Sequence, residues 1–229
     1  MLDKLEVFFR YLIDYEYYQL VLQGLLNTLL IAVGGLLIGI VIGSIVAAVK
    51  VAGTRNRVMK WISYICDVYT GIFRGTPIVI QLIIFHYIVF CGKLDNLLEA
   101  VLIFGLNSGA YVSEIMRGGI LSVDIGQTEA GRTLGLSYLT TMLRVVIPQA
   151  IKNVVPTLGN ELIALTKDTS VAGYVAALDL NAAFTAIQGA TYDYFVPYIF
   201  LALIYLVLVI LMTVLVRLIE RRMRKSERR

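Results

Sequence analysis

The chain has 229 residues, of which 59% are hydrophobic and 16% are charged, and its formal net charge is +4. A soluble domain normally carries about a quarter charged residues, so this composition excludes an ordinary water-soluble domain. The apolar residues form long runs with few charges, and a helix that crosses a bilayer needs about 20 such residues. We therefore predict an all-α integral membrane protein.

Residues 1–19 lack the pattern of a cleavable signal peptide, because acidic side chains are mixed with aromatic ones and a basic start is missing. Leu2, Leu5, Phe9 and Leu12 recur at helical spacing. This spacing predicts a short helix at the outer surface of the membrane. A frayed tail is the alternative.

Five apolar segments predict membrane-spanning helices within one transmembrane domain, residues 20–219. Their expected limits are about 20–46, 61–90, 97–120, 155–172 and 197–218. The second segment is longer than a bilayer requires, and the sequence Arg74-Gly75-Thr76-Pro77 interrupts it. Because proline removes a helical hydrogen bond and clashes with the preceding turn, we expect a kink or break there.

The basic residues are unevenly distributed between the loops, and this asymmetry predicts the orientation of the chain. Most of the 20 lysines and arginines, including Arg55, Arg228 and Arg229, follow the first helix, the third helix or the fifth helix. The opposite side has only Lys4, Arg10 and Lys93, and the loop Tyr174–Phe195 has no basic residue. We expect the amino terminus outside, and the basic tail, residues 220–229, in the cytoplasm.

A row of small residues marks one face of the first predicted span. Gly35, Gly39 and Gly43 lie four residues apart, and Ala47 continues the row. Small residues at this spacing let two helices approach closely. The row predicts helix packing, either within the subunit or against a second subunit.

The predicted cytoplasmic loop, residues 121–153, is too long to be a simple connection. We expect two short helices in it, the first over Thr128–Leu134. Gly135 suits the left-handed conformation that ends such a helix. Ser137 is a suitable N-cap for the second helix, which Pro148 ends or kinks.

A spaced motif runs through this loop: Glu129-Ala130-Gly131, then Gly135, then Val145, Ile147 and Pro148. It resembles the EAA loop of ABC importer permeases, whose pattern is E-A-A, three residues, G, nine residues and I-x-L-P. The spacing matches throughout. The departures are a glycine at the third position of the triplet, valine for isoleucine and isoleucine for leucine.

Further motifs resemble the polar amino acid uptake permeases, also known as the histidine/glutamine/arginine permease family. They are Arg74–Pro77 with Gln81; Asn107–Tyr111 with Glu114, Arg117, Gly118 and Gly119; Gly159-Asn160-Glu161; Lys167–Ser170; and Glu220-Arg221-Arg222. They occur in the family's order. The resemblance covers about Gly24 to Arg222, which is nearly the whole chain.

The resemblance implies a type I ABC importer transmembrane domain in a bacterial cytoplasmic (inner) membrane. Its partners would be ABC ATPase subunits, an extracytoplasmic amino-acid-binding protein and a second permease subunit, either the same chain or a paralogue. The chain has no G-x-x-x-x-G-K-[ST] phosphate loop. ATP and Mg²⁺ are therefore expected on the partner ATPase, with no cofactor and no enzymatic activity on this chain.

The resemblance also implies which residues couple the chain to the ATPase. In the family the EAA loop forms a helix that lies in a cleft of the ATPase. The matching residues here are Glu129, Ala130, Gly131, Arg132 and Gly135. For Glu129 and Arg132 the alternative is an ordinary solvated helix surface, since exposed charges are common.

Polar and charged residues within the predicted spans are the candidates for a substrate path, because charges are costly inside a membrane. The candidates are Arg74, Thr76, Asn160, Glu161, Lys167 and Asp168. Glu161 would attract the cation of an amino acid, which favours a polar and in particular a cationic substrate. Alternatively, Glu161 pairs with Arg74 or Lys167, or Lys167 extends to the membrane surface.

Glu114 and Arg117 lie three residues apart on one helix face, which predicts a local ion pair. The single histidine, His86, has no accompanying cluster of cysteines or histidines, so a metal site is not expected.

Three other functions remain as alternatives. An ABC permease for another small solute, such as methionine or an inorganic anion, would keep the EAA-like loop. A transporter or channel that works without ATP would leave that loop unexplained, and the inverted repeat that would favour it is not evident. A membrane enzyme would need a converging set of reactive groups.

Overall fold

The computed structural model describes residues 2–54 and 57–225, and it gives the side chains up to residue 223. Within these ranges every regular element is a helix and no β-strand occurs. Arg55, Arg228 and Arg229, which contribute to the predicted orientation, lie outside the described residues. The all-α fold class is confirmed.

The chain divides into two compact units, each assembled from three stretches of sequence. Unit 1 comprises Met1–Leu37, Thr76–Gly105 and Leu162–Met212, and unit 2 comprises Ile38–Gly75, Leu106–Glu161 and Thr213–Arg229. Long helices contribute residues to both units. The two units are described separately below.

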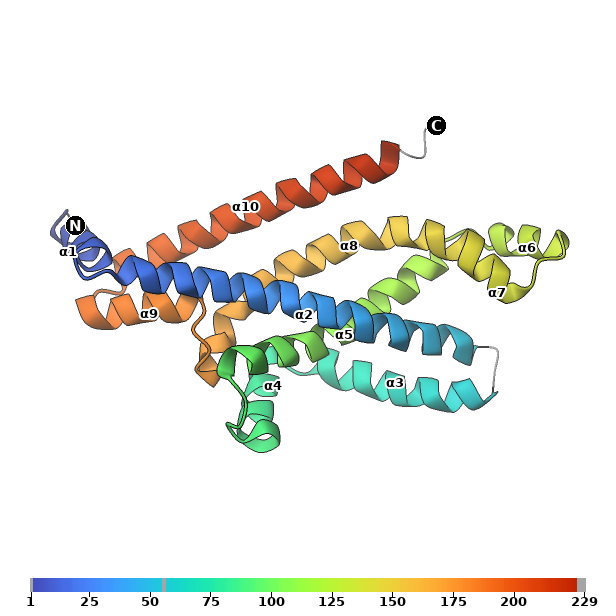
Figure 1. Cartoon of the computed structure of the whole chain (residues 1–229), viewed down its shortest axis with the longest axis horizontal. Helices are drawn as coiled ribbons and strands as arrows, with labels where there is room; N and C mark the ends of the chain where they lie inside the picture. Colours follow the sequence, from blue (N-terminus) through green and yellow to red (C-terminus); the bar gives the residue numbers. More distant parts are fainter. Residues whose placement is uncertain (1, 55–56, 226–229) are drawn as a thin grey trace. The chain divides into compact units, whose positions relative to one another are not determined.

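Unit 1 contains the amino-terminal helix and parts of four long helices (Figure 1). Its elements are α1 (Leu2–Ile13), the first part of α2 (Tyr17–Gly53), α4 (Ile78–Ile84), the π-helical turn η1 (Phe85–Phe90), the start of α5 (Asn96–Leu121), the end of α8 (Ile147–Asp168), the 3₁₀ turn η3 (Thr169–Val175), α9 (Leu180–Thr191) and the first part of α10 (Phe195–Lys225). Ile103 and Phe104 of α5 lie fully buried in one apolar cluster with Leu82 of α4.

The amino-terminal helix is confirmed, and the alternative of a frayed tail is wrong. Phe8 of α1 is buried in a second apolar cluster, and its ring stacks on that of Phe200 at 4.7 Å between centroids. Lys4 Nζ forms an ion pair with Asp193 Oδ1 at 2.8 Å. Helix α1 packs against α9 (Figure 1), so these contacts hold it to the rest of unit 1.

The predicted loop Tyr174–Phe195 is wrong in part, because it contains helix α9. The Asp179 carboxylate begins this helix by accepting hydrogen bonds from the backbone N–H groups of Asn181 and Ala182 at 3.2 and 2.9 Å. Leu180, Phe184 and Ile187 are buried at helical spacing. An acidic N-cap followed by this spacing is a helix signal that hydropathy alone does not reveal.

Unit 2 contains the remaining parts of the long helices together with a helical hairpin. Its elements are the second part of α2, α3 (Arg57–Gly75), the second part of α5, α6 (Ile125–Thr133), α7 (Tyr138–Thr141), the π-helical turn η2 (Met142–Val146), the first part of α8 and the end of α10. Figure 1 shows α6 and α7 lying side by side, and the two helices are in contact.

The row of glycines on α2 packs within the subunit, against α5. In unit 2, a Cβ added at Gly39 would lie 2.6 Å from Ser108 Oγ, and one at Gly43 would lie 2.8 Å from the backbone nitrogen of Ser113. In unit 1, a Cβ at Gly35 would lie 3.0 Å from the Cβ of Phe104. Since any larger residue would push α5 away, the first of the two predicted packing partners is the right one.

The predicted break near Pro77 is confirmed, because α3 ends at Gly75 and Pro77 precedes α4. In unit 1, Gln81 Nε2 donates hydrogen bonds to the carbonyl oxygen of Thr76 at 3.0 Å and to its Oγ1 at 2.9 Å. In unit 2, Asn107 Nδ2 donates to the carbonyl oxygen of Phe73 at 3.3 Å. Amide side chains therefore bind carbonyl groups on both sides of the break.

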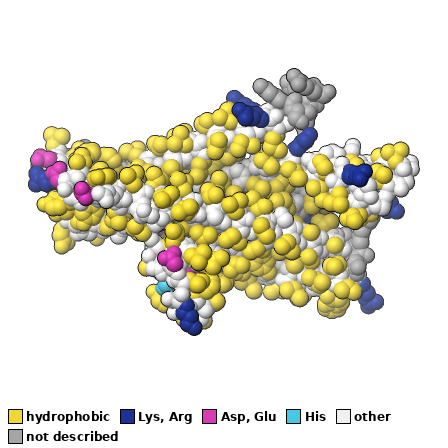
Figure 2. All heavy atoms as spheres, viewed as in Figure 1, with side chains coloured by type: hydrophobic (Ala, Val, Ile, Leu, Met, Phe, Trp, Pro, Cys, Tyr) yellow, Lys and Arg dark blue, Asp and Glu magenta, His cyan; other side chains and the backbone are white. Residues whose placement is uncertain are grey.

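Apolar side chains cover most of the face in Figure 2, as expected for a chain whose outer surface faces lipid. Among the described residues, Tyr17–Gly53 and Phe195–Met223 are long and apolar enough to cross a membrane. Two pairs of helices meet the same requirement if each pair is one broken span: Arg57–Gly75 with Ile78–Phe90, and Tyr138–Val175 with Leu180–Thr191. Helix α5 has 26 residues but does not belong to this group, since polar and charged side chains interrupt it.

The close contact of α2 and α5 yields a first prediction. G43A should lower the free energy of unfolding by about 1–3 kcal/mol, because the added methyl group meets backbone atoms of α5. G118A is the matched control on α5, since a Cβ at Gly118 meets nothing within 4 Å. Thermal unfolding of the detergent-solubilised variants measures both effects. Equal stability of G43A and G118A would contradict the packing.

Candidate functional site

The turn between α6 and α7 has the conformation that the sequence predicts. Gly135 has φ +80°. Its N–H donates to the carbonyl oxygen of Arg132 at 3.0 Å, and the N–H of Leu136 donates to that of Gly131 at 3.0 Å. This pair of bonds is the Schellman motif, so the left-handed cap at Gly135 is confirmed.

Both helices of the hairpin have side-chain caps at their amino-terminal ends. Asp124 Oδ1 accepts from the N–H of Gly126 at 2.6 Å, so α6 begins at Ile125, three residues before the predicted start. Ser137 Oγ accepts from the N–H of Thr140 at 3.2 Å, which confirms it as the cap of α7. We refer to residues 125–141 as the α6–α7 hairpin.

Gly131, which replaces an alanine of the family motif, is buried where α6 meets α7. A Cβ at this position would lie 2.6 Å from Cγ2 and 2.8 Å from Oγ1 of Thr141. The Thr141 hydroxyl donates to the carbonyl oxygen of Ser137 at 3.0 Å, which holds the side chain in place. The glycine therefore compensates for a bulky threonine in the facing helix.

The chain does not end a helix at Pro148. Instead α7, η2 and α8 follow one another without a break, and α8 begins at Ile147 rather than near residue 155. Pro148 is the second residue of α8 and lies inside this continuous helical stretch. The wider π-helical turn Met142–Val146 directly precedes α8.

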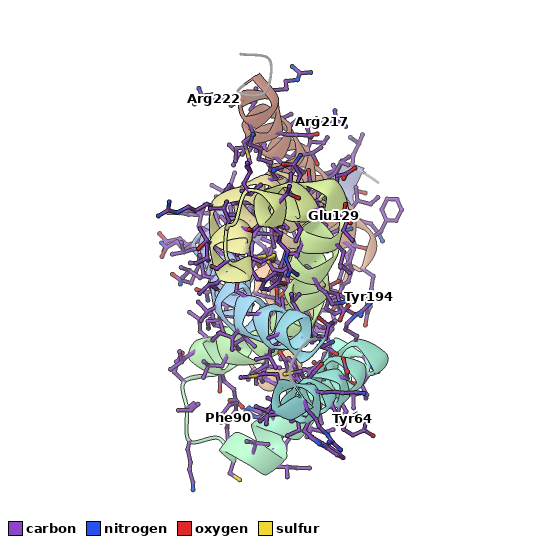
Figure 3. All side chains as sticks on the ribbon, turned by 90° about the vertical axis from the view of Figure 1, so that its right-hand side faces the viewer. Tyr64, Phe90, Glu129, Tyr194, Arg217 and Arg222 are labelled. Carbon is purple, nitrogen blue, oxygen red and sulfur yellow. The ribbon has the colours of Figure 1, made fainter. Side chains whose placement is uncertain are left out.

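The predicted coupling residues lie on the surface of the hairpin, except for Gly131. Glu129, Ala130, Arg132 and Gly135 are exposed, and Figure 3 shows Glu129 on α6, with Arg217 and Arg222 on α10. Their exposure leaves them accessible to a partner protein.

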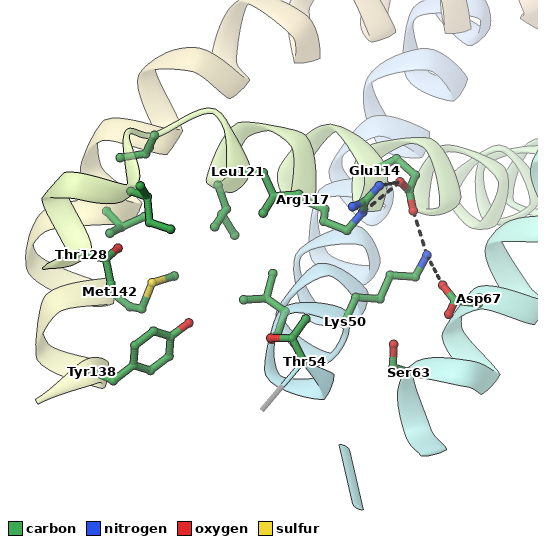
Figure 4. Close-up of a pocket in the computed structure, with 15 residues that line it drawn as sticks. Lys50, Thr54, Ser63, Asp67, Glu114, Arg117, Leu121, Thr128, Tyr138 and Met142 are labelled. Atoms are coloured by element: carbon green, nitrogen blue, oxygen red, sulfur yellow. Dashed lines mark hydrogen bonds and ion pairs between the residues drawn. The ribbon is translucent and has the colours of Figure 1, made fainter. Parts of the chain in front are cut away.

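The ion pair between Glu114 and Arg117 is confirmed, and it belongs to a larger network that the sequence did not reveal. Arg117 Nη2 and Nε donate to Glu114 Oε2 at 2.7 and 3.1 Å. Lys50 Nζ, on α2, lies 2.8 Å from Glu114 Oε1 and 2.9 Å from Asp67 Oδ1 of α3 (Figure 4). It also donates to Thr70 Oγ1 at 2.9 Å. We call Asp67, Lys50, Glu114 and Arg117 the Lys50 network.

A cavity of about 470 Å³ separates the Lys50 network from the α6–α7 hairpin and the following turn (Figure 4). Its lining on the hairpin side includes Thr128, Tyr138 and Met142. All residues that line it belong to unit 2. Nothing close to Lys50 in the sequence indicates that it has partners on two other helices, so its place in this network could not be predicted.

The candidate substrate-path residues fall in both units. In unit 2, the Arg74 guanidinium lies over the ring of Tyr111, 5.6 Å from its centroid. Ser108 Oγ donates to Glu161 Oε1 at 3.4 Å, and Asn160 is exposed. Glu161 thus has a polar partner on α5.

In unit 1, Lys167 and Asp168 are exposed at the end of α8, and Thr76 is exposed beside Pro77. Thr169 Oγ1 donates to the carbonyl oxygen of Thr166 at 2.8 Å. The Thr169 hydroxyl thus binds a backbone carbonyl group where α8 ends.

The only histidine has a buried partner that sequence analysis missed. His86 Nδ1 lies 2.9 Å from Glu99 Oε2, and Glu99 is fully buried at the start of α5. Glu99 lies close to the polar end of its segment, so hydropathy gave no sign that it is buried. Among the residues that the structure describes, no group of three or more histidine, cysteine or acidic side chains could hold a metal ion.

Residues 39–225 match the protein family described as binding-protein-dependent transport system inner membrane component. The chain belongs to this family. The family assignment confirms the predicted resemblance to binding-protein-dependent importer permeases.

Several relatives match along almost their whole length. The arginine transport system permease protein ArtQ of Bacillus subtilis is 37% identical over 210 residues, covering 90% of this chain and 94% of that protein. The putative glutamine transport system permease protein GlnP of Rickettsia bellii is 38% identical over 219 residues, covering 94% and 98%. The L-cystine transport system permease protein TcyB of B. subtilis is 34% identical over 215 residues, covering 93% and 90%.

Two solved structures share the fold. The crystal structure of an amino acid ABC transporter with histidines matches with a TM-score of 0.82 and 35% identity, covering 93% of this chain and 98% of the other. An inward-facing structure of the MetNI methionine ABC transporter matches with a TM-score of 0.77 and 18% identity, covering 90% and 97%. The second likeness shows the fold alone.

The contact between Gly131 and Thr141 yields a second prediction. G131A should destabilise the α6–α7 hairpin by about 1–3 kcal/mol, because the new methyl group overlaps the threonine side chain. Hydrogen exchange of the amides of residues 125–141 measures the loss. T141A alone and G131A/T141A complete a double-mutant cycle. The loss of hairpin stability caused by G131A should be smaller when Thr141 is already alanine. An equal loss of stability with and without T141A would contradict the packing.

Proposed function

We propose that the chain is the permease subunit of an ATP-driven, binding-protein-dependent importer of a polar L-amino acid. The family match and the 35% identity to an amino acid ABC transporter along nearly the whole chain carry this proposal. The relatives ArtQ, GlnP and TcyB are named for arginine, glutamine and cystine, which are all polar. A permease for another small solute is the second candidate.

ATP hydrolysis takes place on a separate ATPase subunit, which binds ATP and Mg²⁺, and an extracytoplasmic binding protein delivers the substrate. The α6–α7 hairpin is the ATPase contact. Its two caps and the Schellman turn give it a defined shape, and Glu129 and Arg132 project from it into solvent. A second permease subunit completes the pathway.

The chain spans a bacterial cytoplasmic membrane five times, with its amino terminus outside. The distribution of basic residues between the two units supports this orientation. Unit 1 has only Lys4, Arg10, Lys93 and Lys167, whereas unit 2 has all the other lysines and arginines and includes the hairpin. The membrane potential and lipids favour basic segments on the cytoplasmic side.

In unit 2, the side chains best suited to an amino acid substrate are Asn160 and Glu161 of α8 and Arg74 of α3. In unit 1, the corresponding candidates are Thr76, Lys167 and Asp168. A carboxylate attracts the α-ammonium group, and a guanidinium binds an α-carboxylate. Tyr111 positions the Arg74 guanidinium by a cation–π contact, and Ser108 positions the Glu161 carboxylate by a hydrogen bond. The Glu161 carboxylate attracts a cationic amino acid more strongly than a neutral one.

A third prediction concerns the substrate. The chain is reconstituted in vesicles with its partner ATPase and binding protein, and ATP-dependent uptake of labelled arginine, glutamine, cystine and methionine is measured. E161Q keeps the size of the side chain and removes its charge. Uptake of arginine should fall more than that of glutamine. E6Q, which removes an exposed charge from α1, is the control.

The outcomes separate the two candidate functions. Uptake of a polar amino acid by the parent supports the proposed function, and uptake of methionine alone favours the second candidate. If E161Q transports as well as the parent, Glu161 is structural and the preference for cations is wrong.

A fourth prediction concerns orientation. After replacement of Cys66 and Cys91, single cysteines are introduced by Y192C and T133C, both at exposed positions. In intact cells, a membrane-impermeant maleimide should label Y192C but not T133C, since residue 133 belongs to the cytoplasmic hairpin. Labelling of T133C without opening the membrane would overturn the orientation.

A further inference from the structure

The Lys50 network leaves no hydrogen-bonding group of Lys50 for a ligand. An ammonium group has three donors, and Lys50 directs them to Asp67, Thr70 and Glu114. The second oxygen of Glu114 receives two hydrogen bonds from Arg117. The hydrogen-bonding groups of Lys50 on this wall of the cavity therefore already have partners. The cavity is free space between this wall and the α6–α7 hairpin.

The members of the network differ strongly in exposure. The side chains of Lys50 and Glu114 are 7% and 21% exposed, whereas those of Asp67 and Arg117 are 59% and 42% exposed. Water competes with an ion pair at an exposed carboxylate, so the contact between Lys50 and Asp67 is the one that opens most readily. It joins α3 to α2, while the buried contact between Lys50 and Glu114 joins α2 to α5.

The same helix, α3, carries Arg74 in its last turn. Tyr69 Oη of α3 donates to the carbonyl oxygen of Leu106 in α5 at 2.6 Å, and Arg74 lies over Tyr111 of α5. A shift of α3 along α5 would therefore move the Arg74 guanidinium relative to Tyr111.

We propose that Lys50 is a positioning residue for coupling. Together with the bond to Thr70, its contact with Asp67 holds α3 in register on α5. Because α5 ends at Leu121, just before the α6–α7 hairpin, movement of the hairpin reaches α3 and Arg74 through α5. The cavity between the network and the hairpin gives the hairpin room to move. This inference rests on the proposed import function. It adds to that function a route by which movement at the ATPase contact reaches a candidate substrate residue.

The test compares Asp67→Asn with the parent in the full transporter, with its ATPase and binding protein, using arginine and glutamine as probes. Import per ATP hydrolysed should fall about two- to fivefold, the size of effect that a half-exposed ion pair supports. Membrane abundance and Tm should stay close to those of the parent, because Asp67 is largely exposed. K50R, which keeps the charge, should retain more coupling than K50M.

Lys60→Met is the matched control, since it removes an exposed lysine from the same helix and should leave import per ATP unchanged. Parent-like import per ATP in D67N would overturn the inference while leaving the proposed function intact. A lower abundance or Tm of D67N with unchanged import per ATP would show a structural role only and would also overturn it. If the parent shows neither binding-protein-stimulated ATP hydrolysis nor import, the proposed function fails and this inference fails with it.

Discussion

The arrangement of helices in unit 2 depends on one buried cation. The Lys50 ammonium group is nearly inaccessible to water, and an unpaired charge in such a place is strongly unfavourable. Its three acceptors come from α3 and α5, so α2, α3 and α5 are confined to positions in which all three reach Lys50. Removing the less exposed partner, Glu114, would generally cost more than the pair contributes. The Lys50–Glu114 contact therefore restricts where α2 and α5 can lie.

The glycine row of α2 makes this constraint possible. Gly39 and Gly43 let α2 approach α5 to direct contact with Ser108 and Val112, and Lys50 follows Gly43 by two turns on the same helix. The same approach places Ser108 where it can bind Glu161. Packing by small residues, the buried ion network and a candidate substrate residue are thus linked through the second half of α5.

The sequence was sufficient for the features that are local in the chain. The left-handed Gly135, the Ser137 cap, the break before Pro77 and the pairing of Glu114 with Arg117 each depend on residues a few positions apart. Features that depend on partners farther apart in the chain were missed. These are the ion pair of Lys50 with Asp67 and the contact of His86 with Glu99. Helix α9 was missed for a different reason, since a short helix with polar residues between its apolar ones has no strong hydropathy signal. The proposed coupling and substrate residues stay predictions.

The most direct measurement of the central claim is an electron cryomicroscopy structure of the whole nucleotide-free transporter, with two permease subunits and the ATPase. We expect Ile125–Thr133 to lie in the ATPase interface and Lys50 to contact both Asp67 and Glu114. An α6–α7 hairpin left in solvent while the ATPase binds another segment of the chain would contradict the account.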